Sequence, residues 1–355
     1  MKQKIAIALL ALPLLASAQI EGQWSIERIN AWYAGIGAIK GCNYLPATAV
    51  NDIDMWQESS FDPSTIQKEL KLAHESGYNS VRVFLHQLVW EKQKVSFKKN
   101  METFLAIADR NQITVMFVVF DDCTAPGQTP FVGVQKDPLP GLHNSRWVAN
   151  PGPDAAEDKS RFPAYEAYLK DIISSFKDDH RILAWDLYNE PANIGGGAAS
   201  TQSKELILSA FKWAREIQPS QPLTVGAWNM GNHLEDEMSQ LMMSHSDFIT
   251  FHSYKDIEDL KSRIAACRKF NRPIVNTEWL RRQVGNTFEQ VIPVFKENKI
   301  GWYHWGLVQG KTQTWLHWSS SKEEPRDKPW QHDMFTPGHE AYDPQEIEMV
   351  RAFEF

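Results

Sequence analysis

Short runs of apolar and β-branched residues alternate along this chain with longer stretches in which apolar residues recur at helical spacing. This alternation is typical of βαβ units that build a parallel sheet. Eight short runs are predicted to be strands, at Gly41–Leu45, Ser80–Leu85, Ile113–Phe120, Ile182–Leu187, Leu223–Ala227, Phe248–Phe251, Pro273–Asn276 and Gly301–Trp305.

A helical pattern follows each predicted strand. Asp62-Pro63-Ser64 has the cap chemistry that opens the first helix, and Gly77 ends it. The predicted helices are Thr65–Glu75, Lys98–Arg110, Ala164–Phe176, Thr201–Ile217, Leu234–Met243, Ile257–Phe270, Thr287–Glu297 and Pro344–Ala352. An open doubly wound sheet would also alternate in this way, but eight repeats favour closure. We therefore predict an α/β fold with a single (β/α)8 barrel of the TIM-barrel type.

Two segments between these elements are unusually long. Asp121 to Phe162 follows the third strand, and Leu307 to Tyr342 follows the eighth. Loops of this length in a compact domain usually carry function. Both leave the C-terminal ends of strands, where barrels of this type build their sites.

The amino terminus has the layout of a secretory signal peptide. A basic start, Met1 to Lys4, precedes an apolar run from Ile5 to Leu15 and a small-residue cleavage site at Ala16-Ser17-Ala18. The apolar run is shorter than the roughly 20 residues that span a bilayer, and no cysteine follows it to carry a lipid anchor. A buried N-terminal helix is the alternative. We predict a signal peptide at residues 1–18, a catalytic barrel at 19–355, and export to the periplasm or beyond.

Composition and charge narrow the choice of partners. The 355 residues carry a net charge of −7, which disfavours nucleic acid and anionic membranes. The three cysteines, Cys42, Cys123 and Cys267, lack the spacing of a metal site, so neither metal nor cofactor is expected. Cys42 and Cys123 are predicted to be small buried hydrophobes. The chain contains fourteen tryptophans, an unusually high number. Some of them are suited to stacking on sugar rings, although core packing explains others.

Two predicted strands end in a glutamate. Trp185-Asp186-Leu187-Tyr188-Asn189-Glu190-Pro191 places Glu190 after the fourth strand, and Ile274-Val275-Asn276-Thr277-Glu278-Trp279 places Glu278 after the seventh. A carboxylate that closes an apolar strand is costly unless it faces a solvated or functional cavity. Each alone could be a turn residue or an ion-pair partner. Facing each other across a barrel mouth, one held protonated and one ionised, they suit the cleavage of a glycosidic bond.

With these motifs the chain resembles the clan A glycoside hydrolases, and within them family 5. The resemblance implies that Glu190, beside Asn189, is the acid/base and that Glu278 is the nucleophile. It implies a retaining hydrolase of β-linked plant-type polysaccharides or oligosaccharides, acting through a covalent glycosyl-enzyme intermediate. We expect Glu190 to have a raised pKa because it is buried near a second carboxylate, and Glu278 to have a lowered one.

Further positions match the family residue by residue. Arg82 on the second strand resembles the arginine that keeps the nucleophile ionised, with a salt bridge at the barrel bottom as the alternative. His252 and Tyr254, after the sixth strand, resemble a pair that supports Glu190 and donates to Glu278; His252 as a core histidine is the alternative. The resemblance also implies that Asn189 binds the sugar 2-hydroxyl and that Trp305 lies under the cleaved sugar.

The chain departs from the family at two positions. Phe120 and Trp279 stand where many members carry a histidine and a phenylalanine. Loop residues with suitable side chains are candidates for substrate contacts by position alone: Asp122, His143, Asn144 and Trp147 in the third loop, and Lys311 and Trp330 in the eighth.

Two other functions remain open at this stage. A metal-dependent barrel hydrolase would need clustered histidine and aspartate at strand ends, and loss of activity in EDTA would favour it. A carbohydrate-binding barrel without catalysis would keep the fold but release no product from a nitrophenyl β-glycoside.

Overall fold

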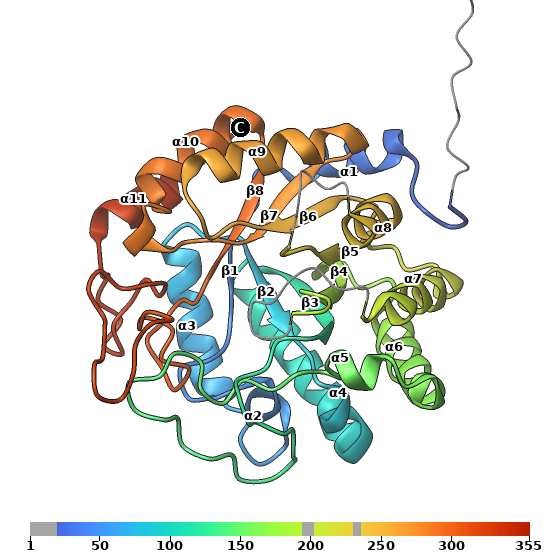
Figure 1. Cartoon of the computed structure of the whole chain (residues 1–355), viewed down its shortest axis with the longest axis horizontal. Coiled ribbons are helices and arrows are strands. Elements are labelled where there is room, and N and C mark those ends of the chain that lie inside the picture. Colours follow the sequence, from blue (N-terminus) through green and yellow to red (C-terminus); the bar gives the residue numbers. More distant parts are fainter. Residues whose placement is uncertain (1–19, 194–201, 230–235) are drawn as a thin grey trace, which may run out of the picture.

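Eight parallel strands form one nearly closed barrel in the computed structural model, which describes residues 20–193, 202–229 and 236–355 (Figure 1). The order is β5-β4-β3-β2-β1-β8-β7-β6, and a bridge between Ala227 and Phe251 joins β5 to β6. The strands are β1 (Lys40–Asn43), β2 (Ser80–Phe84), β3 (Thr114–Asp121), β4 (Ile182–Asn189), β5 (Leu223–Gly226), β6 (Ile249–His252), β7 (Ile274–Glu278) and β8 (Gly301–Trp305).

Helices surround the barrel and follow the strands in turn (Figure 1). They are α3 (Pro63–Glu75), α4 (Gln87–Arg110), α6 (Phe162–Phe176), α7 (Lys204–Ile217), α8 (Glu237–His245), α9 (Ile257–Cys267), α10 (Phe288–Asn298) and α11 (Pro344–Ala352). The predicted (β/α)8 barrel is confirmed, and strand bounds differ from the prediction by no more than two residues. None of the helices in the described ranges is long and apolar enough to cross a bilayer. The predicted signal peptide lies outside those ranges.

Several elements escaped the sequence pattern. They are α1 (Ile26–Ile36), α2 (Asp52–Trp56), α5 (Pro153–Ala156), the first half of α4, and the short 3-10 turns η1 (Lys159–Arg161), η3 (Arg268–Phe270) and η4 (Arg282–Val284). Ile29 is the one fully buried residue of α1, so this helix has no broad apolar stripe to detect. With Trp24 and Trp32 it packs against Phe248 and Tyr303, beneath the start of the strands. The helix therefore closes the N-terminal end of the barrel.

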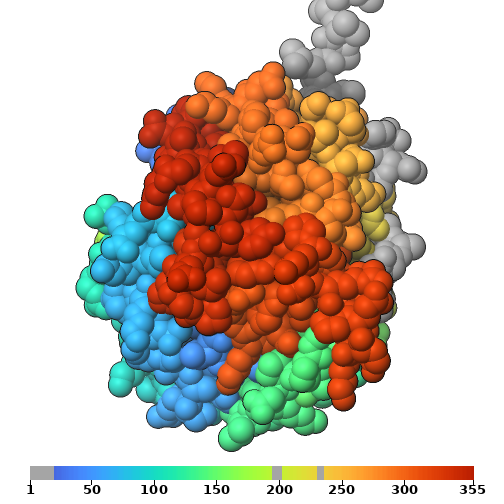
Figure 2. Space-filling model, turned by 90° about the vertical axis from the view of Figure 1, so that its left-hand side faces the viewer, coloured from blue at the N-terminus to red at the C-terminus, as the bar shows by residue number. Residues whose placement is uncertain are grey.

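The two long loops lie against each other at the opposite end. The Asn144 amide donates to the Thr312 carbonyl at 2.7 Å, and the Gln313 side chain donates to the Leu139 carbonyl at 2.7 Å. Nδ1 of His143 donates to the Leu316 carbonyl at 2.8 Å. Figure 2 shows the red β8 loop beside the green β3 loop on one face of the molecule. Together they wall one side of the C-terminal mouth, as expected for functional loops of this fold.

Candidate active site

The C-terminal mouth holds a cavity of about 790 Å³ between the two long loops and the strand ends. Volumes of this size are typical of small-molecule sites. Its wall contains eight of the ten predicted site residues: Asn189, Glu190, Glu278, His252, Tyr254, Trp305, Trp147 and His143. Of the other two, Arg82 lies beneath the cavity, and Asp122 faces away from it.

The two glutamates face each other across the cavity. One carboxylate oxygen of Glu190, one of Glu278 and a ring nitrogen of His252 all lie within 4.8 Å of one another. Carboxylate oxygens this close fit the ~5–5.5 Å separation of the carboxyl groups in retaining glycosidases better than the ~6.5–9.5 Å separation in inverting ones. Glu190 has a left-handed backbone (φ 43°), a strained conformation of the kind that collects at functional sites. Its amide donates to the Gly226 carbonyl, so β5 holds the turn in place.

Arg82 organises the charges beneath the cavity. Its guanidinium, fully buried, donates to Glu278 Oε1 at 2.9 Å and to Asp186 Oδ2 at 2.8 Å. It also donates to Asn43 Oδ1 at 2.7 Å and to Asn189 Oδ1 at 2.6 Å. These contacts join β1, β2, β4 and β7 at the mouth. The alternative of a salt bridge at the barrel bottom therefore does not apply.

His252 and Tyr254 each hold one of the two glutamates. Nδ1 of His252 donates to Glu190 Oε1 at 2.6 Å, and the Tyr254 hydroxyl donates to Glu278 Oε2 at 2.9 Å. His252 is buried, but its Nδ1 serves the site rather than the core. Burial raises the pKa of Tyr254 well above its usual value, so the phenol stays a donor.

Two donors to Glu190 were missed by the sequence. The Cys123 thiol donates to Glu190 Oε2 at 3.0 Å, and the Asn193 amide donates to the same oxygen at 2.5 Å. Cys123 lies two residues beyond β3, half-buried on the cavity wall, so the prediction of a buried structural cysteine is wrong for it. Burial raises the pKa of its thiol well above the usual value, so the sulfur keeps its proton and donates. Cys42 is buried as predicted.

These donors reverse the expected protonation order of the pair. Burial by itself would raise the pKa of Glu190, but the hydrogen bonds from His252, Cys123 and Asn193 lower it overall. Burial raises the pKa of Glu278, and the nearby Glu190 carboxylate adds to this against the opposing charge of Arg82. The sequence-based expectation was wrong because two of the donors come from loops whose positions the chain pattern does not reveal.

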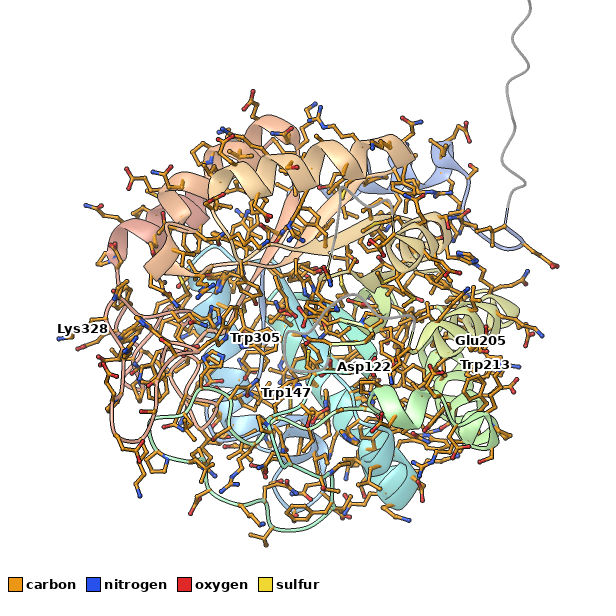
Figure 3. The ribbon with its side chains drawn as sticks, in the orientation of Figure 1. Asp122, Trp147, Glu205, Trp213, Trp305 and Lys328 are labelled. Atoms are coloured by element: carbon orange, nitrogen blue, oxygen red, sulfur yellow. The ribbon has the colours of Figure 1, made fainter. Side chains whose placement is uncertain are left out.

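The remaining predicted residues divide between the cavity and the loops. Trp305 and Trp147 lie edge to face, with ring centroids 5.7 Å apart, near the middle of the barrel (Figure 3). Trp147 donates to Asp121 Oδ2 at 2.7 Å. Asp122 accepts hydrogen bonds from Tyr188, Ser203 and the Ala192 amide, so it fastens the loop after β4 and does not reach the cavity. Of the lesser candidates, Asn144 lines the cavity, whereas Lys311 and Trp330 do not.

A metal centre is the chemical alternative at the same place. Among the described residues, Glu190, His252 and Glu278 form the one group spaced to hold a cation. Both oxygens of each carboxylate already accept a hydrogen bond from the protein. The Arg82 guanidinium also stands 2.9 Å from Glu278, where its positive charge opposes a second cation. This donor set fits a pair of reacting carboxylates better than a metal site.

Comparison with known proteins agrees with this geometry. Residues 41–321 match the family model described as cellulase, glycosyl hydrolase family 5. A probable mannan endo-1,4-β-mannosidase C from Aspergillus terreus is 23% identical over 167 residues, which are 38% of this chain and 41% of that protein. The chain thus spans about two fifths of the length of this curated relative.

Solved structures share the fold at low identity. An exo-β-1,4-mannosidase from an Opitutaceae bacterium aligns with a TM-score of 0.64 and 15% identity, covering 89% of this chain and 59% of that one. The β-mannanase of the blue mussel Mytilus edulis aligns with a TM-score of 0.53 and 17% identity, covering 78% and 87%. The predicted membership of clan A, and of family 5 within it, is confirmed by the family match. Since the family model extends over most of the chain, this protein belongs to glycosyl hydrolase family 5.

Proposed function

We propose that this chain hydrolyses β-linked glycans with retention of configuration, with Glu278 as nucleophile and Glu190 as acid/base. The observation that carries the proposal is the approach of the two carboxylates to within 4.8 Å. β-1,4-Linked mannosides are the first substrates to test, because the relatives it resembles are named as enzymes for mannan or mannosides. Export through the N-terminal signal peptide belongs to the same proposal. N-terminal sequencing of secreted protein should then begin near Gln19, whereas an intact Met1 would contradict export.

The reaction proceeds in two displacements. A Glu278 oxygen attacks the anomeric carbon while the bond to the leaving oxygen breaks and Glu190 gives that oxygen its proton. Glu190 then takes a proton from water, the water oxygen attacks the anomeric carbon, and the bond to Glu278 breaks. The amide of Asn189, on the cavity wall, binds the sugar 2-hydroxyl.

The proposal requires the proton of the pair to lie on Glu190 when the sugar is bound. A glycosidic oxygen beside Glu190 accepts a hydrogen bond only from the protonated carboxyl. Arg82 and Tyr254 both stabilise the ionised form of Glu278. Substrate therefore favours the protonation order that the reaction needs.

A fluorinated glycoside inactivator tests the assignment directly. Since 2-fluoro substitution slows breakdown of the covalent intermediate, the sugar should accumulate on the nucleophile. Peptide mass spectrometry should locate it on Glu278. A label on Glu190 or on any other residue would contradict the assignment.

Replacement of Cys123 by alanine should shift the pH profile. The thiol hydrogen bond lowers the pKa of Glu190, so its loss raises that pKa. Because Glu278 holds the second proton of the pair in the free enzyme, the Glu190 pKa sets the acidic limb of kcat/KM, and this limb should move up by about 0.5–1 pH unit, as expected for one hydrogen bond of about 1 kcal/mol. Cys123→Ser retains a donor and should restore the original limb. Equal limbs in wild type and Cys123→Ala would show that the thiol has no effect on Glu190.

A further inference from the structure

The charged side chains of the cavity wall differ in sign from the chain as a whole. The protein carries a net charge of −7. Apart from Glu190 and Glu278, the charged residues lining the described wall are Lys255, Arg263 and Arg281, all cationic. In a partly enclosed site such charges are screened less than on an open surface. The cavity therefore presents positive charge around its two reacting carboxylates.

The Arg263 side chain already has hydrogen-bond and ion-pair partners within the protein. Its guanidinium pairs with Asp259 at 2.5 Å and donates to the carbonyls of Trp228 and His252. Lys255 contacts Asp259 more loosely, at 3.6 Å, with its side chain 68% exposed. Lys255 thus keeps most of its donors free for a ligand, whereas Arg263 holds the wall in place.

Arg281 has no acidic partner within the described residues. It lies three residues beyond Glu278, where its backbone pairs with Asn286 across the turn after β7. Its guanidinium packs over the Trp318 ring at 4.8 Å, and its buried Nε has no hydrogen-bond partner among the described residues. A guanidinium held on a ring keeps its N–H groups along its edge, where they match the two oxygens of an anion. Burying such a donor without a partner is costly, so its place in the cavity wall points to a ligand.

Trp318 connects this arginine to the reaction centre. Trp318 is 47% exposed as a residue, and its ring meets Tyr254 edge to face, with centroids 5.1 Å apart. Tyr254 in turn donates to Glu278. A sugar that packs on the open part of Trp318 is therefore next to the sugar that reacts at Glu278, and Arg281 lies at its rim.

We propose that this cavity selects an acidic glycan, with a carboxylate or sulfate group on the sugar beside Trp318 bound by Arg281 and supported by Lys255. The inference rests on the proposed function, whose substrate class it narrows. Arg281 is the specificity-determining residue, because it pairs with the anion at short range. Lys255 adds longer-range attraction from the exposed side.

Matched oligosaccharides that differ only in charge test the idea. The probes are neutral β-1,4-manno-oligosaccharides, the same chains with part of their C6 hydroxyls oxidised to carboxylates, and the same chains sulfated at C6. We expect the wild type to have a higher kcat/KM for at least one charged series than for the neutral series. In Arg281→Met the ratio of charged to neutral kcat/KM should fall at least tenfold. Raising NaCl from about 0.05 to about 0.5 M should also lower the wild-type ratio, since salt screens the contact.

Arg110→Met is the matched control, because Arg110 ends α4 at the opposite end of the barrel. Its ratio should equal that of the wild type. Hydrolysis of neutral chains with no change of ratio in Arg281→Met would overturn the acidic-glycan inference alone. The proposed function would be overturned as well if the folded wild type cleaves none of the β-linked probes and also none of a second panel of neutral glucans and xylans. Comparison of the carboxylate and sulfate series identifies which anion is bound.

Discussion

Glu278→Gln should lower kcat on a β-linked oligosaccharide by about 10⁵-fold, a loss on the scale measured when other enzymes lose their nucleophile. Glutamine keeps the size of the side chain, and its carbonyl oxygen can still accept the hydrogen bond from Arg82, while its NH2 group can donate to the Tyr254 hydroxyl oxygen. The carboxylate that would form the bond to the anomeric carbon is gone, however. Initial rates at saturating substrate, with circular dichroism to verify folding, measure the effect.

Replacement of Glu190 distinguishes the acid/base role of Glu190 from the nucleophile role of Glu278. Glu190→Gln should slow cleavage of oligosaccharides by about 10²- to 10⁴-fold, because the leaving oxygen no longer receives a proton. It should slow formation of the glycosyl-enzyme much less with a dinitrophenyl glycoside, whose leaving group needs no proton. Glu258→Gln is the control, since Glu258 is an exposed residue of α9. Retention of more than a tenth of the activity by Glu278→Gln would contradict its role.

Arg82→Met should cost about 3–5 kcal/mol of folding free energy, the range seen when one partner of a buried ion pair is removed. Asp186 and Glu278 would then remain buried beside each other without the cation that both contact. Methionine fills much of the space, so loss of packing contributes less than loss of charge. Urea denaturation gives the free energy of unfolding.

Two further variants make this measurement specific. Arg326→Met removes an arginine that is 46% exposed and pairs with Glu324 at the surface, so it should cost less than about 1 kcal/mol. Arg82→Met combined with Glu278→Gln should be more stable than the sum of the single losses predicts, because one buried charge fewer is left unpaired. Additive losses would show that Arg82 does not interact with Glu278.

The sequence by itself determined the barrel and the two glutamates of its mouth. Strand and helix periods are local properties, and eight repeats of them predict a barrel whose strand ends point the same way. Placing Glu190 after β4 and Glu278 at the end of β7 therefore required no knowledge of distances. The resemblance to the family added Arg82, His252 and Tyr254, and the structure brings all three to the pair.

Only the tertiary structure decided what surrounds that pair. Cys123, Asn193, Trp318 and Arg281 come from loops after four different strands, and none lies in a motif that marks it for the site. Asp122 shows the converse, since it follows β3 as a site residue would, yet fastens a neighbouring loop. The predicted order of the Glu190 and Glu278 pKa values was wrong for the same reason, because loop residues donate hydrogen bonds to Glu190. Periodicity describes how a chain repeats along itself, whereas hydrogen bonds to a buried carboxylate depend on which loops meet across the barrel.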